Sequence, residues 1–174
     1  RVFQYEIILF FVFSTSMFHP KKSFTVNELQ SKMEHYCVYQ DRCHQEIERK
    51  MNEYQMIPEA KEKIYLHLLR HDFLNEERFS KSFARGKFRI KHWGKQRIIR
   101  ELKIKNISSY NIKTALKEID EELYVETIEK IAASKNNTIK ESNLFKKKKK
   151  IYDSLYRKGY ESSLIQETIQ KLFK

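Results

Sequence analysis

The 174-residue chain has few of the residues that make tight corners, with only 3 Gly and 2 Pro. Sandwiches and barrels of short strands need many such corners, so this composition excludes them. It also excludes the glycine-rich loops that hold phosphates in nucleotide-binding folds. The two cysteines, Cys37 and Cys43, are too few for a disulfide framework, and their spacing fits no usual zinc motif. We therefore expect two reduced thiols, no metal, no cofactor and a cytoplasmic protein.

Catalytic motifs are also absent from the sequence. It has no nucleophile elbow, no paired-carboxylate motif and no cluster of metal-ligand residues. Many carboxylates gather in an acidic block, residues 118–129, which is better interpreted as a solvated face than as a two-metal nuclease site. We expect that the protein is not an enzyme. Metal-dependent cleavage that is lost on mutation of Glu121 and Glu122 would indicate a nuclease instead.

An apolar run occupies residues 7–13, close to the first residue of the sequence. The run is too short to span a bilayer, and residues 14–16 make a poor signal-peptide cleavage site. Met17 follows at once and has the character of a natural initiator. We interpret residues 1–22 as an N-terminal extension that is non-native or disordered up to Met17. A weak anchor and a swapped hydrophobic arm are the alternatives.

From Ser23 onward, apolar residues recur at helical spacing almost throughout. The breaks between these segments contain residues that favour the ends of helices. Suitable capping or first-turn residues mark the expected helix starts: Thr25 with Glu28, Pro58, Asn75, and Ser108 or Ser109. The pattern therefore predicts a succession of short helices.

An apolar pattern repeats along these helices. Its second copy has spacings of 5, 5, 4 and 3 residues, in Leu102, Ile107, Ile112, Leu116 and Ile119. The third copy has the same spacings, in Leu155, Tyr160, Ile165, Ile169 and Leu172. The first copy is looser and consists of Met51, Met56, Tyr65 and Leu68. Each copy reads as helix–turn–helix preceded by a leading helix.

The turn residues support this periodicity. Gln55, Asn106 or Gly159 precedes the second position of each copy, and Asn and Gly both tolerate the left-handed conformation that ends a helix. We predict an all-α fold of tandem three-helix, helix-turn-helix-like repeats in an elongated, curved array. The expected units are residues 23–73, 74–119 and 120–174.

The chain is strongly basic, with 35 Lys and Arg against 23 Asp and Glu and a net charge of +12. This excess predicts a polyanionic partner, with nucleic acid favoured over an anionic membrane surface. The middle unit carries most of this positive charge, since residues 79–117 contain a single acid, Glu101. We expect the acidic block that follows to offset part of this charge across a helix junction.

The leading helix of the middle unit separates charge from apolar surface. At about 100° per residue, Phe79, Phe83 and Ile90 share one face, and a row of cations lies on another. Such a row suits phosphates, because each neutralised phosphate releases counterions, and a solvated face is the alternative. We expect DNA contact from a basic stripe of Arg78, Lys81, Arg85, Arg89, Lys91, Lys95, Arg97, Arg100 and Lys103.

A lysine run comes before another expected helix and consists of Lys146, Lys147, Lys148, Lys149 and Lys150. Cations near a helix N-terminus are mildly unfavourable, so a bound phosphate would relieve them. A solvated segment is the alternative. Phe88 and Trp93 are better interpreted as packing residues than as platforms for bases.

Four stretches resemble the RecX family of bacterial recombinase regulators. They read YCVYQDRC at residues 36–43, FLNEERF at 73–79, FAR at 83–85 and GKQRIIRELK at 94–103. The likeness covers about residues 26–173. In these stretches we expect structural roles for Tyr36, Tyr39, Phe73, Leu74, Phe79, Gly94, Ile98 and Leu102.

The resemblance implies a modular protein of three-helix repeats that modulates the RecA recombinase. Such proteins bind along the groove of the filament that RecA forms on single-stranded DNA and restrain its recombinase and ATPase activities, within DNA recombination, repair and the SOS response. Many of them also bind DNA directly. We expect a monomer that contacts RecA, its filament and DNA, but no membrane. The alternative function is a stand-alone helical DNA-binding protein of helix-turn-helix type.

Overall fold

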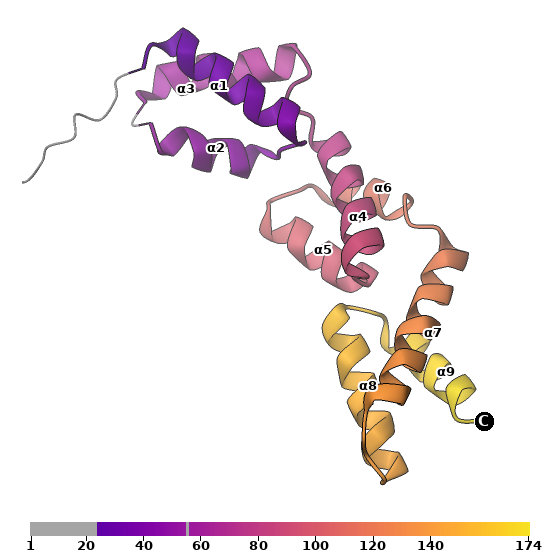
Figure 1. Cartoon of the computed structure of the whole chain (residues 1–174). Coiled ribbons are helices and arrows are strands. Elements are labelled where there is room, and N and C mark those ends of the chain that lie inside the picture. Colours follow the sequence, from indigo (N-terminus) through magenta and orange to yellow (C-terminus); the bar gives the residue numbers. More distant parts are fainter. Residues whose placement is uncertain (1–23, 55) are drawn as a thin grey trace, which may run out of the picture.

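The structure is a computed structural model that describes residues 24–54 and 56–174, and this part of the chain contains helices and no strands (Figure 1). The all-α prediction is confirmed. The extension at residues 1–22 lies outside the described residues, so its interpretation stays a prediction. The helices are α1 (Val26–Tyr39), α2 (His44–Asn52), α3 (Pro58–Arg70), α4 (Glu76–Lys91), α5 (Lys95–Ile104), α6 (Ser109–Leu116), α7 (Glu121–Thr138), α8 (Leu144–Lys158) and α9 (Ser162–Leu172).

The helices form three successive groups of three along an elongated, curved array (Figure 1). Helix–helix contacts concentrate inside each group, where α1 packs on α3, α4 on α6, and α7 on both α8 and α9. The second helices of the groups, α2, α5 and α8, lie along one side of the array, the lower left side in Figure 1. The predicted tandem repeat is therefore present, and we keep residues 23–73, 74–119 and 120–174 as its proposed units.

Helix starts follow the predicted capping residues. The Thr25 hydroxyl accepts a hydrogen bond from the Glu28 backbone N–H at 3.2 Å, and Glu28 completes the capping box. Asn75 caps α4, Ser108 caps α6, and Pro58 occupies the first turn of α3. These predictions are confirmed, with Ser108 chosen over Ser109.

The turns between second and third helices depend on two left-handed residues. Asn106 has φ +59° and Gly159 has φ +90°, a conformation that asparagine and glycine accept more readily than other residues. The equivalent residue of the first unit, Gln55, lies outside the described residues. The turn chemistry predicted for the second and third units is confirmed.

Two hydrophobic clusters form the core. One belongs to the first unit and contains Leu29, Met33, Cys37, Ile47, Met51, Ile64, Leu68 and Leu74. The other runs without interruption through the second and third units, from Phe79 in α4 to Ile169 in α9, and also takes in Cys43. The predicted apolar repeat agrees with the observed burial. In the second and third units, four of the five repeat residues are buried. The remaining residue, Leu116 or Leu172, is partly buried and packs against the same cluster.

The predicted apolar face of α4 is wrong at one end. Ile90 is 74% exposed, whereas Phe88 is buried at 3%. The face that α4 buries against α6 passes through Phe79, Ala84 and Phe88, because the neighbouring helices select this side. Phe88 is therefore a packing residue, as predicted. Tyr39 is also misassigned, since it is the last residue of α1 and 85% exposed, too far from the core to pack there.

Candidate nucleic-acid interface

Arg78, at the first turn of α4, is a structural residue and is removed from the predicted stripe. Its guanidinium donates to Asp41 at 2.9 Å and to Asp72 at 2.6 Å. It also donates to the backbone carbonyls of Asp72 and Phe73. Because all four acceptors belong to the first unit while Arg78 belongs to the second, Arg78 fastens the junction between these units and has little capacity left for a phosphate.

Three more cations of the stripe are paired with acids. Lys81 lies 2.6 Å from Glu77 in the same helix. Arg85 and Lys95 reach into the acidic block, where Arg85 lies 2.8 Å from Glu118 and Lys95 pairs with Glu121. The expected offset between the basic and acidic blocks is thus observed, and it neutralises part of the surface that the sequence assigned to DNA.

The remaining cations of the stripe form no ion pair with any described residue. They are Arg89, Lys91, Arg97, Arg100 and Lys103. Arg89, Lys91, Arg100 and Lys103 are exposed, whereas the Arg97 guanidinium lies over the Trp93 ring, 4.0 Å from its centroid. We call these five residues the open cations, and they are the part of the stripe that remains available to a polyanion.

A group of like charges extends the open cations into the third unit. Burial lowers the pKa of Lys158 below its ordinary value, and the neighbouring charges of Lys135 and Arg97 lower it further. The Lys158 ammonium donates to the Lys91 carbonyl at 3.2 Å, and no carboxylate among the described residues pairs with it. Uncompensated charge at this junction favours an anionic partner.

The lysine run lies in the first half of α8, as predicted, with Asn143 as its N-cap. Lys150 pairs with Glu141 at 2.7 Å, and Lys148 lies over the Phe173 ring at 5.1 Å. Lys146, Lys147 and Lys149 have no ion pair within the described residues. Phosphate contact by this run stays a prediction.

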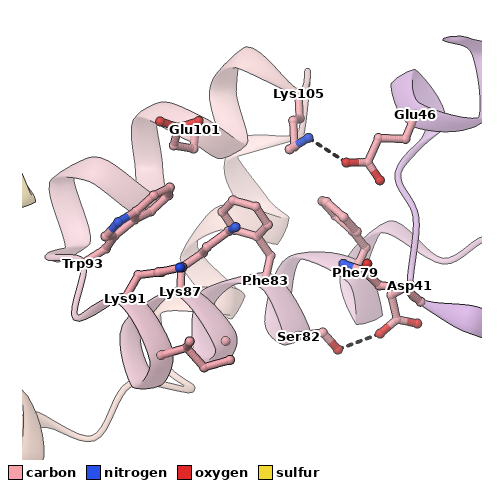
Figure 2. Close-up of a pocket in the computed structure, with 13 residues that line it drawn as sticks. Asp41, Glu46, Phe79, Ser82, Phe83, Lys87, Lys91, Trp93, Glu101 and Lys105 are labelled. Carbon is pink, nitrogen blue, oxygen red and sulfur yellow. Dashed lines mark hydrogen bonds and ion pairs between the residues drawn. The ribbon is translucent and has the colours of Figure 1, made fainter.

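Two hollows border α5. The first hollow has a volume of about 550 Å³ and lies between the α1–α2 loop, α4 and α5 (Figure 2). Phe83 and Trp93 form its apolar wall, and the Lys87 ammonium lies 5.1 and 5.2 Å from their ring centroids. Asp41, Glu46 and Glu101 line it too, so its charge is mixed and favours no polyanion.

The second hollow, which we call the α5–α8 groove, has a volume of about 800 Å³. It lies between α5 and the corner that joins α8 to α9. Two open cations, Arg100 and Lys103, line it, together with apolar and aromatic side chains and one acid, Glu161. The sequence predicted these cations, but it gave no sign that they border a groove with the third unit, because that depends on how the units pack.

The structural residues of the resemblance have mixed placements. Leu74, Phe79, Ile98 and Leu102 are buried. Tyr36 and Phe73 pack against the first cluster, and Gly94 meets Gly159 in the tightest contact between the second and third units. Sequence reasoning missed Tyr124, which lies at the centre of that junction. The signal that the sequence offered was an aromatic residue one turn after the Asp120 N-cap.

No group of three or more His, Cys, Asp or Glu side chains in residues 24–54 and 56–174 is placed to hold a metal ion. Both cysteines are free and buried, and burial raises the pKa of the Cys37 thiol to about 11. None of the described helices combines the length and the hydropathy that a bilayer span requires.

Tandem three-helix units define an all-α repeat protein, and comparison with known proteins identifies the family. The model of the second three-helix domain of RecX matches residues 75–116, and that of the third matches residues 121–169. The two matched ranges together cover just over half of the chain. The chain belongs to the RecX family.

Individual relatives agree with this assignment. The regulatory protein RecX of Lactobacillus gasseri is 24% identical over 137 residues, which are 79% of this chain and 51% of that protein. The protein of the same name from Bacillus cytotoxicus is 23% identical over 137 residues, which are again 79% of this chain and 51% of that protein. The chain thus spans about half the length of the curated relatives it matches.

Solved structures show the same fold. The crystal structure of RecX from Lactobacillus salivarius has a TM-score of 0.74 and 24% identity, over 84% of this chain and 96% of that chain. A second crystal structure, of a regulatory protein RecX, has a TM-score of 0.72 and 23% identity, over 83% of this chain and 74% of that chain.

Proposed function

We propose that this protein regulates the RecA recombinase by binding along the filament that RecA forms on single-stranded DNA. Bound there, it restrains the recombinase and ATPase activities during recombination, DNA repair and the SOS response. The observation that carries the proposal is membership of a family of regulatory proteins, with two successive three-helix domains matched in register. Its partners are RecA, the filament and DNA, and it acts as a monomer in the cytoplasm.

The arrangement of the units supports this proposal. The array is elongated (Figure 1), and a long contact surface lets residues from three repeats meet a filament at several points. The open cations lie in the middle and at the junction with the third unit, where they reach phosphates while the flanks contact protein. The acids of residues 118–129 that remain exposed guide the register of the complex.

The alternative of a stand-alone helix-turn-helix protein receives less support. A recognition helix needs several side chains that reach base edges or phosphates. The third helix of the middle unit, α6, contains a single cation, Lys113. Sequence-specific protection of duplex DNA by this chain alone would favour that alternative.

The deciding experiment measures ATP hydrolysis by RecA on single-stranded DNA while the chain is added. We expect the rate to fall in proportion to the amount of chain and then to level off, since inhibition by coating is stoichiometric. A variant with Arg89, Arg97, Arg100 and Lys103 changed to Ala should inhibit less. The double variant Lys113→Ala and Lys117→Ala, at exposed cations of the same unit, is the matched control. An unchanged hydrolysis rate at saturating chain would reject the proposal.

A further inference from the structure

We propose that the α5–α8 groove holds one strand of single-stranded DNA, with Tyr156 as a stacking platform for a base and Arg100 and Lys103 as phosphate contacts. This inference rests on the DNA contact within the proposed function and assigns it a place. The groove is the hollow of about 800 Å³ between the second and third units.

Charge selects the occupant. Arg100 and Lys103 are one helical turn apart on α5, both are exposed, and neither pairs with a described acid. Glu161 is the acid that lines the groove, and its carboxylate accepts a hydrogen bond from the Tyr124 hydroxyl at 2.7 Å. The groove is therefore cationic along its α5 wall, which suits a phosphate backbone.

The opposite wall supplies an aromatic surface. Tyr156 on α8 is 59% exposed, and its ring is stacked on Tyr152, with centroids 6.0 Å apart and planes 13° apart. Ile99 and Ile104 add apolar surface from α5, and Ile104 is 63% exposed. A wall of cations and aliphatic side chains that faces an aromatic wall is a combination that suits single strands, because each unpaired base offers a face for stacking.

The walls of the groove are fixed before any ligand binds. The Gly94 N–H donates to the Lys158 carbonyl at 2.8 Å, and the Gln96 N–H donates to the Gly159 carbonyl at 3.0 Å. Below them, the Lys95 N–H donates to the Tyr124 hydroxyl at 2.9 Å. Backbone bonds between the two units hold the width of the groove, so little ordering is required when a strand enters.

A duplex fits this site poorly. Bases inside a double helix are stacked on their neighbours and paired, so their faces are not open to a tyrosine ring. The groove therefore prefers single strands, and Tyr156 supplies that preference, while Arg100 and Lys103 act on any phosphate backbone.

The test measures how the chain alone, without RecA, binds a labelled oligothymidylate. Fluorescence anisotropy reports the binding at each concentration of a salt series. Tyr156→Ala should weaken binding by about 5-fold or more, as expected for the loss of one stacked base, and leave the salt slope unchanged. Tyr156→Phe should bind like the wild type. The double variant Arg100→Ala and Lys103→Ala should reduce the salt slope by about 1.4, since each phosphate contact on a single strand contributes about 0.7.

Tyr110→Ala is the matched control, because Tyr110 is a 70% exposed tyrosine on α6, outside the groove. Binding to a duplex of the same length should not respond to Tyr156→Ala. The inference is overturned if Tyr156→Ala binds the single strand like the wild type, or if Tyr110→Ala loses as much. It is also overturned if Tyr156→Ala inhibits RecA less but binds the single strand as before, since the groove would then be a contact for protein. Because the binding assay contains no RecA, its result is independent of the ATPase test.

Discussion

The two junctions of the array are built from different interactions. Between the first and second units the contacts are mainly polar, and Lys105 lies 2.7 Å from Glu46 (Figure 2). In addition, His44 lies 2.7 Å from Glu76, and Arg78 reaches Asp41. The core clusters on either side remain separate, and among the described residues of the first unit Cys43, the residue before α2, is the one buried apolar side chain that joins the second cluster.

The junction between the second and third units is apolar and continuous. The ring of Tyr124 lies 5.7 Å from that of Phe88 and 5.1 Å from that of Tyr160, which links α4, α7 and the turn between α8 and α9. Gly94 and Gly159 allow the backbones to touch, since a Cβ on Gly94 would lie 2.2 Å from the Gly159 carbonyl. Shared cores unfold together, whereas charge-paired surfaces open separately, so we infer one cooperative body of two units and a first unit attached by polar contacts.

The largest expected effect is on whether the first unit unfolds separately from the second and third units. Leu102→Ala empties a fully buried site in the shared core and should cost about 2–5 kcal/mol. Leu68→Ala removes an equally buried side chain from the first cluster. Because Cys37 and Cys43 belong to different clusters, thiol labelling read by mass spectrometry separates the two events. Leu102→Ala should speed the labelling of Cys43 more than that of Cys37, and Leu68→Ala should do the reverse; equal acceleration in both variants would show a single core.

The second effect concerns the close backbone contact. Gly94→Ala should destabilise the second and third units by about 1–3 kcal/mol, because its Cβ meets backbone atoms that cannot move aside easily. Gly86→Ala is the control, since nothing lies within 4 Å of its Cβ and alanine favours a helix interior. Urea denaturation of both variants checks this. Equal stability of the two variants would contradict the tight contact.

A smaller effect is expected at the polar junction. Arg78→Ala removes a guanidinium that is 40% exposed and should cost about 1 kcal/mol, since solvent screens part of its ion pairs. Hydrogen exchange should accelerate around Asp41, and high salt should reduce the difference from the wild type. Lys81→Ala, which removes a pair inside α4, serves as the control. Unchanged exchange at Asp41 would mean that other contacts hold this junction.

The smallest effect is a dependence on acid. Burial acts to raise the pKa of Asp41, but hydrogen bonds from Ser82 and Arg78 outweigh it and hold that pKa below the ordinary value. Its contribution to stability is therefore complete above about pH 4 and is lost as the pH falls through the lowered value. When the urea midpoint is measured as a function of pH, Asp41→Asn should reduce the fall of the midpoint in acid. Asp153→Asn, at an exposed aspartate of α8, should leave it as it is.

Local chemistry predicted much of this fold. The caps at Thr25, Asn75 and Ser108 and the turn at Gly159 depend on residues that are close in sequence, and all of them were found by pattern. Ile90 was misplaced because helical periodicity alone does not tell which of two adjacent faces a neighbouring helix covers.

The candidate site was less predictable for the same reason. Arg78 and Asp41 are 37 residues apart, and Arg85 and Glu118 are 33 apart, so only the packing of the units reveals which cations are neutralised. The α5–α8 groove likewise has walls from two repeats. Composition predicted a polyanionic partner, and the tertiary structure showed which of the predicted cations form no ion pair within the described residues.

The position of Trp93 gives the molecule an intrinsic fluorescence signal. Trp93 is the single tryptophan of the chain, and it lies in the first hollow with the charged ends of Arg97 and Lys87 at 4.0 and 5.2 Å from its ring. Indole emission responds to nearby charge and to water. A phosphate that draws Arg97 away, or a shift of the first unit that opens the hollow, changes the surroundings of the same ring. The chain therefore contains its own optical reporter in the first hollow, and neither event requires an attached dye to be followed.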